Sequence, residues 1–380
     1  MTRVEGEWLA RAWWDDRPVA ESTATVREDQ PGEEPTLWFP RADVRVDEIP
    51  ADLVPDRPGG PGGHVAFDHG RVRIEVVDDV GGEVTSKRFP TWGDATHIVD
   101  LLDVRPDGEH RYVTAARTDW RRPVVEGSQI LGQAIVAAGR HAPGRRPVSA
   151  HMVFLRPADA ALPFTLELDE LTAGKTFTTL AVQARQGDRH IASGTLLLDA
   201  LAPDVVRHGA PPPPDRPGPT DPASVPFDMA VTGRDVRIVD GAYTGDPDAP
   251  VGPPELDAWV RYRADAVPDD DPHLHAGLLA HFTGHLPIAA ALRPHAGVGQ
   301  SQAHRTISTA INAITLSLHA EVRADRWLGY HHRSTFVGDG MSHAECRVHD
   351  EQGTLLASFT VEAMVRPFRS AVPADERRAL

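Results

Sequence analysis

The chain has 380 residues, 41% of them apolar, which is enough for a large buried core and, at about 150 residues per domain, predicts two or three domains. Its formal net charge of −16, with lysine only at Lys87 and Lys175, repels a phosphate backbone, so nucleic acid is not an expected partner. The single cysteine, Cys346, excludes an internal disulfide, and no apolar run reaches the ~20 residues that span a bilayer, so we expect a cytoplasmic protein that does not enter a membrane.

Residues 1–92 predict a small β-rich domain. Strand-like stretches around residues 19–26 and 37–46 precede a Pro/Gly loop at 55–63. The segments TLWFPRADVRVD (36–47) and HVAFDHGRVRIEVVD (64–78) resemble the family called domain of unknown function 427, although the stretch expected between the two motifs is reduced to the Pro/Gly loop. That resemblance implies a fold and no activity. Trp8, Trp13, Trp14 and Trp38 are candidates for a ligand groove, whereas aromatic residues in short strands more often belong to a core.

Residues 93–202 and 225–370 read as two copies of one unit. The first unit starts with HRYVTAART (110–118), continues with a helix over GSQILGQAIVAAGRH (127–141) and ends with four strands. The second unit repeats this order with a helix near 274–292, and QGTLLASFTVEAM (352–364) echoes QGDRHIASGTLLL (186–198). The expected strands are 148–155, 164–171, 176–186 and 189–199 in the first unit, and 312–320, 326–334, 341–349 and 354–365 in the second.

The segments between and after these units predict little regular structure. Residues 203–224 contain seven prolines after Pro203 and few apolar anchors, which indicates a semi-extended linker. Residues 371–380 form a tail. In each unit the alternating strands bury one face against the long helix, which is the hotdog arrangement. The expected fold class is therefore α+β, a double hotdog preceded by the β-rich domain.

Several motifs fall in the order found in one known family. They are EGSQILGQA (126–134), FLRP (154–157), WVRYR (259–263), LRPH (292–295), AHR (303–305), LLAS (355–358) and EAMVRP (362–367). Together they resemble the acyl-CoA thioesterase II family over about residues 93–368. The resemblance implies a double hotdog, an acyl-CoA or acyl-carrier-protein substrate, a hydrolase of the thioesterase type and a homodimer as a compatible assembly.

The family's hydrolytic groups are not where the resemblance places them. The family holds a water with an Asp at the helix, a Thr or Ser at the start of a strand and a Gln in the last strand, so that a carboxylate takes a proton while neutral partners orient the water. The corresponding positions here are Gly284, Ile311 and Val361, and a one-residue slip substitutes Asn312 for Ile311. Because Val361 continues the apolar face of strand 355–365, we expect the ordinary hydrolytic site to be absent.

Other polar residues are candidates to replace those groups. His281 and His285 lie four residues apart on one helix face, with Thr283 between them, and His285 is the preferred general base. Asn312 shares an apolar strand face with Ile314 and is a candidate oriented amide. The alternatives are core or surface histidines and an exposed strand-end asparagine. Glu362, on the polar face of the last strand, is either a catalytic or a rim carboxylate.

The start of the first central helix is a candidate for substrate binding. Gly127, Gln129 and Gln133 lie there, where backbone N–H groups can stabilise an oxyanion, although the glutamines can equally cap the helix. His273 and His275, like His281 and His285, lack a third metal ligand, and no nucleotide or serine-hydrolase motif is present. We therefore expect no metal and no cofactor.

Three functions remain open after this reading. The first is a thioesterase with a rebuilt site, in which His285 and Asn312 position water on an acyl thioester. The second is a non-hydrolytic reaction of a biosynthetic pathway, such as elimination, addition or cyclisation, for which loss of the water-holding groups would protect the thioester. The third is a non-catalytic module that binds an acyl group or a partner. The resemblance favours a thioesterase-like enzyme.

Overall fold

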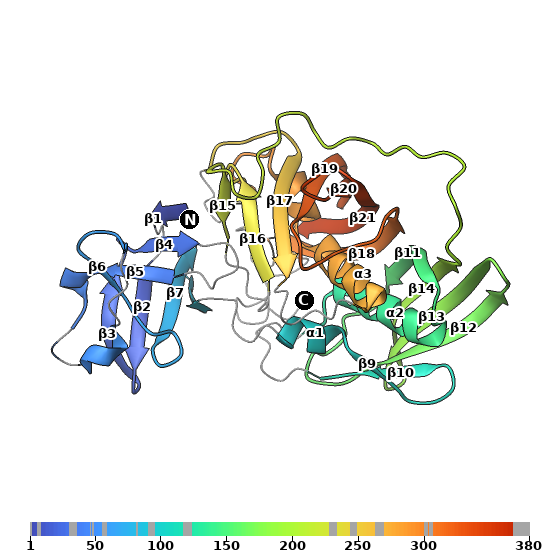
Figure 1. Ribbon diagram of the computed structural model, residues 1–380, viewed down its shortest axis with the longest axis horizontal. Coiled ribbons are helices and arrows are strands. Elements are labelled where there is room, and N and C mark those ends of the chain that lie inside the picture. The colour runs from blue at the N-terminus through green and yellow to red at the C-terminus, as the bar shows by residue number, and fades with distance from the viewer. Residues whose placement is uncertain are drawn as a thin grey trace.

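The computed structural model in Figure 1 describes residues 2–5, 9–29, 36–45, 47, 49–54, 59–80, 83–89, 96–116, 124–227, 234–243, 249–262, 270–299, 303 and 307–367. Two small sheets form the N-terminal part, and one long antiparallel sheet with central helices forms the rest. The α+β class and the β-rich opening expected from the sequence are confirmed.

Eight short strands build the two N-terminal sheets. One sheet has the order β1-β4-β5-β6, and the other has the order β3-β2-β7-β8. Their bounds are β1 Thr2–Glu5, β2 Leu9–Trp14, β3 Arg17–Ser22, β4 Val26–Asp29, β5 Thr36–Pro40, β6 His64–Ala66, β7 Arg73–Val80 and β8 Glu83–Phe89. The strand expected over 37–46 is shorter than predicted because residues Arg41–Asp43 turn into a 3-10 helix, η1. A second 3-10 turn, η3, covers Ala51–Leu53.

The aromatic residues of this part are mostly structural. Phe39 and Phe67 pack edge to face with ring centroids 5.5 Å apart in the core between the sheets. Trp38 is buried, and its ring lies so close to Gly60 that a Cβ there would be 2.3 Å away. Trp13 donates a 3.0 Å hydrogen bond to Glu75. Trp38 is therefore a core residue, and Trp8 lies outside the described residues.

The long sheet contains thirteen of the described strands and joins the two predicted units edge to edge. Its order is β15-β16-β17-β19-β20-β21-β18-β11-β14-β13-β12-β10-β9, and β11 pairs with β18 where the units meet. The first unit comprises α1 Thr96–Leu102, β9 Val104–Pro106, β10 Arg111–Thr114, α2 Gly127–His141, β11 Arg146–Phe154, β12 Thr165–Ala173, β13 Phe177–Gln186 and β14 Arg189–Asp199. The second comprises β15 Ser224–Pro226, β16 Arg234–Val239, β17 Glu255–Tyr262, α3 Pro272–His281, η4 Phe282–Gly284, α4 Pro287–Leu292, β18 Ile307–Leu318, β19 Leu328–Gly338, β20 Met341–His349 and β21 Leu355–Pro367.

An approximate two-fold axis relates the two units, and it passes between α2 and α3. The helices lie side by side inside the curved sheet (Figure 1) and touch where Gly132 faces Gly277, since a Cβ on Gly132 would lie 2.6 Å from the Gly277 carbonyl oxygen. Gly277 follows Gly132, and Gly284 follows Gly139, by the same 145 residues. Glycine is needed at this crossing because the backbones are in contact. The double hotdog is thus confirmed.

The second central helix is not continuous, which corrects the helix expected over 274–292. α3 ends at His281, a 3-10 turn follows, and α4 starts at Pro287. Side chains capture the last carbonyl groups of α3, because Tyr262 donates to Leu278 O at 2.8 Å, Tyr330 to Leu279 O at 3.0 Å and Thr283 to Ala280 O at 2.7 Å. With its carbonyl groups bonded in this way and a proline ahead, the helix cannot propagate through the turn.

The proline-rich segment between β14 and β15 is docked onto the second unit. It runs across the molecule as the long yellow-green segment in Figure 1 and has no helix or strand between Asp199 and Ser224. Its anchor is Arg216, whose guanidinium lies 4.4 Å from the Trp259 ring centroid and 3.2 Å from the Asp257 carboxylate. The same guanidinium donates to Ala258 O at 3.1 Å and to Tyr330 O at 2.9 Å. We call residues 207–219 the strap.

We expect Arg216→Ala to release the strap and destabilise the second unit. Removing one member of a buried ion pair costs about 3 kcal/mol because the remaining charge is left desolvated. Urea denaturation should show this loss, and limited proteolysis should cut the strap faster. Arg207→Ala is the matched control, because its side chain is 72% exposed and it pairs with Asp204 at the surface, where ion pairs contribute little. Equal stability of the two variants would contradict the anchoring role of Arg216.

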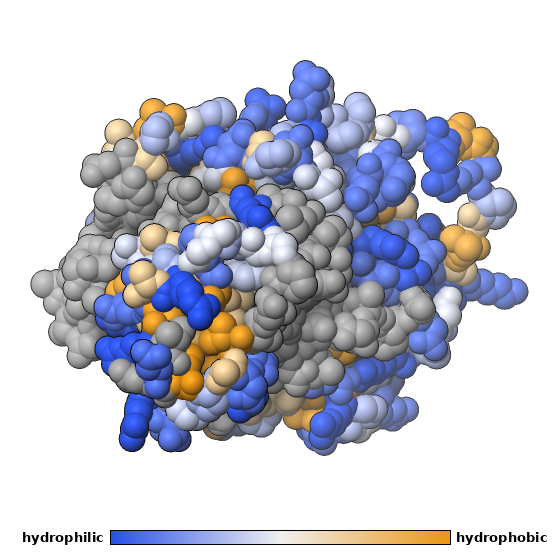
Figure 2. All heavy atoms as spheres, turned by 60° about the vertical axis from the view of Figure 1, so that its left-hand side comes forward, coloured by the Kyte–Doolittle hydropathy of each residue, from blue (hydrophilic) through white to orange (hydrophobic). Residues whose placement is uncertain are grey.

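The described surface is largely polar. Hydrophilic residues cover most of the coloured surface in Figure 2, and hydrophobic atoms gather in a few separate groups. Among the described helices, none is long and apolar enough to cross a membrane.

Candidate functional site

The candidate site lies where the N-terminus of α2 meets the break after α3. A Cβ built on Gly284 would lie 2.8 Å from Ser128 Oγ and 3.8 Å from Ile311 Cγ1. The positions that the resemblance assigns to the family's Asp and Thr, Gly284 and Ile311 (or Asn312), are therefore close together, and neither Gly284 nor Ile311 has a polar side chain. The Ser128 hydroxyl occupies the volume that a longer side chain at position 284 would need. Ser128 itself is buried, so the serine and the glycine are complementary in size.

The two predicted histidines belong to a buried cluster with Arg234 and Glu126. The His281 and His285 ring centroids are 5.3 Å apart, and His285 stacks on Phe282 with centroids 4.9 Å apart. Arg234, which begins β16, places Nη1 3.4 Å from His281 Nδ1 and Nη2 3.1 Å from His285 Nε2. Glu126, at the N-cap of α2, places its carboxylate 3.3 Å from His285 Nε2 and 4.0 Å from His281 Nε2.

Burial shifts the pKa values of His281 in this cluster and of the neighbouring Tyr262. Burial, and then the neighbouring Arg234 and His285, hold the pKa of His281 well below its usual value of 6.5. Burial also raises the pKa of Tyr262 to about 12, against the opposing effect of Arg234. His281 and Tyr262 are therefore neutral near pH 7. A neutral histidine beside a carboxylate and a guanidinium can take up and return a proton.

Asn312 lies at a β-bulge beside the same site. Ile311 pairs with Ala363 and Ala313 with Glu362, so Asn312 is the extra residue of β18. Its Oδ1 atom is buried and has no hydrogen-bond partner among the residues that the structure describes. A buried amide oxygen without a partner is costly, and bulges commonly re-aim a side chain near functional sites. Asn312 is thus a candidate to contact a bound ligand.

The equivalent place in the first unit has no such polar side chain. β11 carries a bulge at the same point, between Pro147 and Ser149, and the extra residue there is Val148. The approximate symmetry relates Ser128 to His273, and a Cβ on Gly139 would meet the His273 ring at 2.1 Å. The His273 ring therefore fills the space that faces Gly139. Of the two symmetry-related sites, the one at the α2 N-terminus contains the histidine cluster and Asn312, which are candidates for acid-base chemistry.

The other predicted residues are distributed between this site and structural roles. Gly127 lies at the α2 N-terminus against the Phe154 ring, which would be 2.8 Å from a Cβ there, and Gln129, two residues further on, is buried. Gln133 donates to Leu101 O at 2.6 Å and so ties α1 to α2. Thr283 caps α3. Val361 is buried and pairs with Ile314.

Glu362 lies on the opposite face of the sheet. Its neighbours along β21, Val361 and Ala363, are buried against the helices, whereas the Glu362 side chain is 42% exposed and lies 3.8 Å from His343. It therefore does not face the histidine cluster. This corrects the hypothesis that Glu362 takes part in the same site, because consecutive strand residues point to opposite faces.

Arg234, Glu126 and Ser128 were missed by sequence reasoning. Arg234 begins a strand whose six residues are all buried, and a charged residue in such a strand signals a paired or functional group. Glu126 precedes the helix by one residue and corresponds to Asp271, which caps α3 by accepting a 2.9 Å bond from Leu274 N. Glu126 makes no such side-chain cap bond, and its carboxylate lies 3.3 Å from His285 and 4.0 Å from His281.

His332 extends the aromatic stack behind the site and makes stability depend on pH. The Tyr330 ring lies 4.9 Å from Phe282 and 6.1 Å from His332. Burial lowers the pKa of His332 from 6.5 to about 3. Between these values the unfolded chain binds a proton that the folded chain does not, so stability decreases as pH falls below about 6.5.

We expect this histidine to cost roughly 2 kcal/mol of stability between pH 7 and pH 5. Denaturant unfolding of the wild type and of His332→Leu at both pH values measures the contribution of His332. The difference in unfolding free energy between pH 7 and pH 5 should be smaller in the variant by this amount. An unchanged difference between pH 7 and pH 5 in the variant would show that His332 is protonated in the folded protein.

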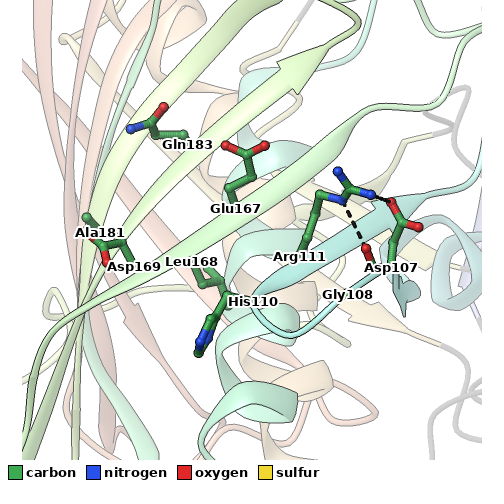
Figure 3. Close-up of a pocket in the computed structure, with 9 residues that line it drawn as sticks. All are labelled: Asp107, Gly108, His110, Arg111, Glu167, Leu168, Asp169, Ala181 and Gln183. Carbon is green, nitrogen blue, oxygen red and sulfur yellow. Dashed lines mark hydrogen bonds and ion pairs between the residues drawn. The ribbon is translucent and has the colours of Figure 1, made fainter.

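A pocket of about 560 Å³ lies elsewhere, on the first unit. Figure 3 shows its lining from the turn before β10 and from β12 and β13, with Arg111 bonded to Asp107. Its nine residues include Glu167, Asp169 and Gln183 and contain none of the predicted site residues. The polar groups there are at the sheet surface, so this pocket does not continue the candidate site. No three His, Cys, Asp or Glu side chains of the described chain are grouped to hold a metal.

Comparison with known proteins agrees with this geometry. Residues 116–198 match the acyl-CoA thioesterase N-terminal domain, and residues 204–365 match the acyl-CoA thioesterase C-terminal domain. The chain belongs to the acyl-CoA thioesterase II family. Residues before 116 lie outside both matched segments, so the resemblance of residues 1–92 to domain of unknown function 427 stays a prediction.

Individual relatives have low sequence identity to this chain, but the alignments cover most of each relative's length. Human acyl-coenzyme A thioesterase 8 is 24% identical over 311 residues, which cover 71% of this chain and 88% of the relative. The structure of the acyl-CoA thioesterase II TesB2 from Mycobacterium marinum is 25% identical, covers 73% of this chain and 99% of that chain, and superposes with a TM-score of 0.57. The tesB protein of Mycobacterium avium subs paratuberculosis is 24% identical and superposes with a TM-score of 0.58, covering 72% and 100%. These relatives support a thioesterase-like function on acyl thioesters.

Proposed function

We propose that this chain hydrolyses acyl thioesters with a rebuilt catalytic group, in which His285 replaces the missing family carboxylate. The observation that carries the proposal is the 3.3 Å approach of the Glu126 carboxylate to His285 Nε2, directly beside Gly284. A histidine paired with a carboxylate is a general base whose protonated form is stabilised. The pair joins the two units, since Glu126 comes from α2 and His285 follows η4.

Arg234 and Glu126, which both lie near His285 Nε2, explain how this nitrogen can accept a proton and later release it. In the resting state Arg234 donates to Nε2, which is then unprotonated. When His285 accepts a proton from water, the same nitrogen becomes a donor to Glu126. The resulting hydroxide attacks the thioester carbonyl carbon, the carbonyl oxygen becomes an oxyanion, and the C–S bond breaks as the proton returns to the leaving thiolate.

The α2 N-terminus is suited to stabilise the oxyanion. Gln129 N and Ile130 N make the first bonds of this helix, both to Glu126 O, so the N–H groups of Gly127 and Ser128 precede the hydrogen-bonded ladder. Donors at a helix N-terminus favour developing negative charge. Asn312, with its buried Oδ1, is the proposed ligand for the attacking water.

The relatives' names favour coenzyme A as the carrier of the acyl group. Human acyl-coenzyme A thioesterase 8 and the Mycobacterium marinum acyl-CoA thioesterase II, both named for acyl-CoA, each align with more than two thirds of this chain. We therefore propose acyl-CoA as the substrate, with an acyl carrier protein as the alternative carrier.

The test is release of free thiol from acyl-CoAs of short to long chain length. Wild-type protein should release thiol, and Glu126→Gln should reduce kcat about 100-fold, in the range of general-base effects. Glu170→Gln is the matched control, because Glu170 also pairs with a histidine, His141, at 2.9 Å, but in the first unit away from this site. Equal rates for wild type and Glu126→Gln would refute the role of this carboxylate.

A second candidate follows from the apolar residues at the other family positions. Ile311 and Val361 cannot orient a water, and the thioester would survive in such a site. This favours a non-hydrolytic reaction on the acyl group, or acyl binding alone. Binding of acyl-CoA without thiol release by the wild type would support this candidate and exclude the hydrolase.

A further inference from the structure

Arg237 of β16 is a buried cation on the face of the long sheet that points away from the central helices. It is 4% exposed, and its Nε and Nη1 atoms are buried without a hydrogen-bond partner in the described part of the chain. Along β16, Val236 and Ile238 are buried in the helix-facing core, so Arg237 points away from it. The ladder pairs Arg237 with Trp259 of β17, and Trp259 pairs with Gly329 of β19.

Aromatic rings and further arginines surround this guanidinium. Arg237 lies 5.6 Å and Arg261 lies 4.6 Å from the Trp327 ring centroid. Trp327, Trp259 and Val239 form a small apolar cluster on this face. Arg237 therefore has a ring beneath it, which favours a cation, and it shares that ring with a second positive charge.

The carboxylates of this face interact with the other arginines. Arg261 donates to Asp235 Oδ2 at 3.3 Å, and Arg216 of the strap lies 3.2 Å from Asp257. Among the described residues no carboxylate lies within ion-pairing distance of Arg237. Asp235 and Asp257 are thus paired with Arg261 and Arg216, and neither is paired with Arg237.

We propose that Arg237, with Arg261 and the Trp327 ring, forms a binding site for a small oxyanion, a phosphate or a carboxylate. A buried guanidinium without hydrogen bonds is unfavourable because its desolvation is not compensated. An oxyanion supplies a balancing charge and two acceptor oxygens, which match the fork of N–H groups in arginine. The site is separate from the histidine cluster, which lies on the other face of the sheet.

Inorganic phosphate is the first probe, with acetate as the carboxylate arm and coenzyme A as a phosphate-bearing carrier. Thermal unfolding of the full chain is followed at constant ionic strength while phosphate replaces chloride. Phosphate should raise the Tm of the wild type in a saturable way. Arg237→Met should weaken phosphate binding about tenfold or more, the effect of losing a charge-assisted bond.

Arg326→Met is the matched control, because it removes the same charge at a neighbouring side chain that is 74% exposed. It should bind phosphate as the wild type does. Arg237→Lys keeps the positive charge but lacks the forked N–H groups, so its phosphate affinity should lie between those of Arg237→Met and the wild type. This variant also tests the proposal if Arg237→Met does not fold. Stabilisation by acetate alone would identify the ligand as a carboxylate. Stabilisation by phosphate and by coenzyme A would identify the ligand as a phosphate. The proposal fails if no anion stabilises the wild type, or if Arg237→Met responds as strongly as Arg326→Met.

Discussion

His285→Ala is expected to abolish thiol release from acyl-CoA while leaving the fold intact. The side chain supplies the proposed base, and loss of a positioned general base typically lowers kcat by 10²–10⁴-fold, roughly the effect expected here. KM should change little, because His285 acts on the water and not on the carrier. Steady-state thiol release with a thiol-reactive dye gives kcat and KM separately.

The matched control for this prediction is His141→Ala. His141 ends α2, its side chain is 6% exposed and it lies 2.9 Å from Glu170, so it is also paired with a glutamate, but it belongs to the first unit. Added imidazole should restore part of the activity of His285→Ala, since it can occupy the vacated space as a base, and should not affect His141→Ala. A His285→Ala variant that retains the wild-type rate would rule out His285 as the base and leave the acyl-binding candidate.

The architecture was largely predictable because its determinants are local and repeated. Alternation along strands such as 355–365 fixes which face is buried, and the duplicated order of elements predicts two units. The helix break was not predictable, since it depends on Tyr262 and Tyr330, which come from two separate strands and bond the carbonyl groups of α3. Gly284 and Pro287 were the local signs of that break.

Within the candidate site, sequence reasoning found the residues that are close in sequence and missed those brought in by the fold. His281 and His285 were paired by their spacing of four, and their rings do lie 5.3 Å apart. Arg234 reaches them from a strand that precedes α3 by more than thirty residues, and Glu126 reaches them from the other unit. No periodicity links such residues, so only the three-dimensional arrangement identifies the cluster.

Gly284→Asp, which restores the carboxylate position of the family, is expected to destabilise the protein. Its Cβ would lie 2.8 Å from Ser128 Oγ and 3.1 Å from Ser128 Cβ, and the carboxylate would enter a buried space. Overpacking and desolvation together should cost about 3 kcal/mol. Denaturant unfolding of the single variant measures this loss.

Ser128→Gly should relieve the clash, so the double variant should be more stable than the sum of the single effects. Ser128→Gly alone should cost about 1 kcal/mol, the penalty of glycine in a helix, and the coupling energy should be about 2 kcal/mol in favour of the pair. The restored carboxylate would then face the N-terminus of α2, where negative charge is stabilised. Ser128→Ala combined with Gly284→Asp is the control, because its methyl group still obstructs the space.

The same double variant tests whether His285 has replaced the family's carboxylate at this site. If His285 took over the role of the lost carboxylate, then Ser128→Gly with Gly284→Asp should release thiol even when His285 is replaced by alanine. Ile311 and Val361 remain in that protein, so the rate should stay below that of the wild type. Additive stabilities, with no coupling between positions 128 and 284, would instead mean that Ser128 does not fill the family's carboxylate position.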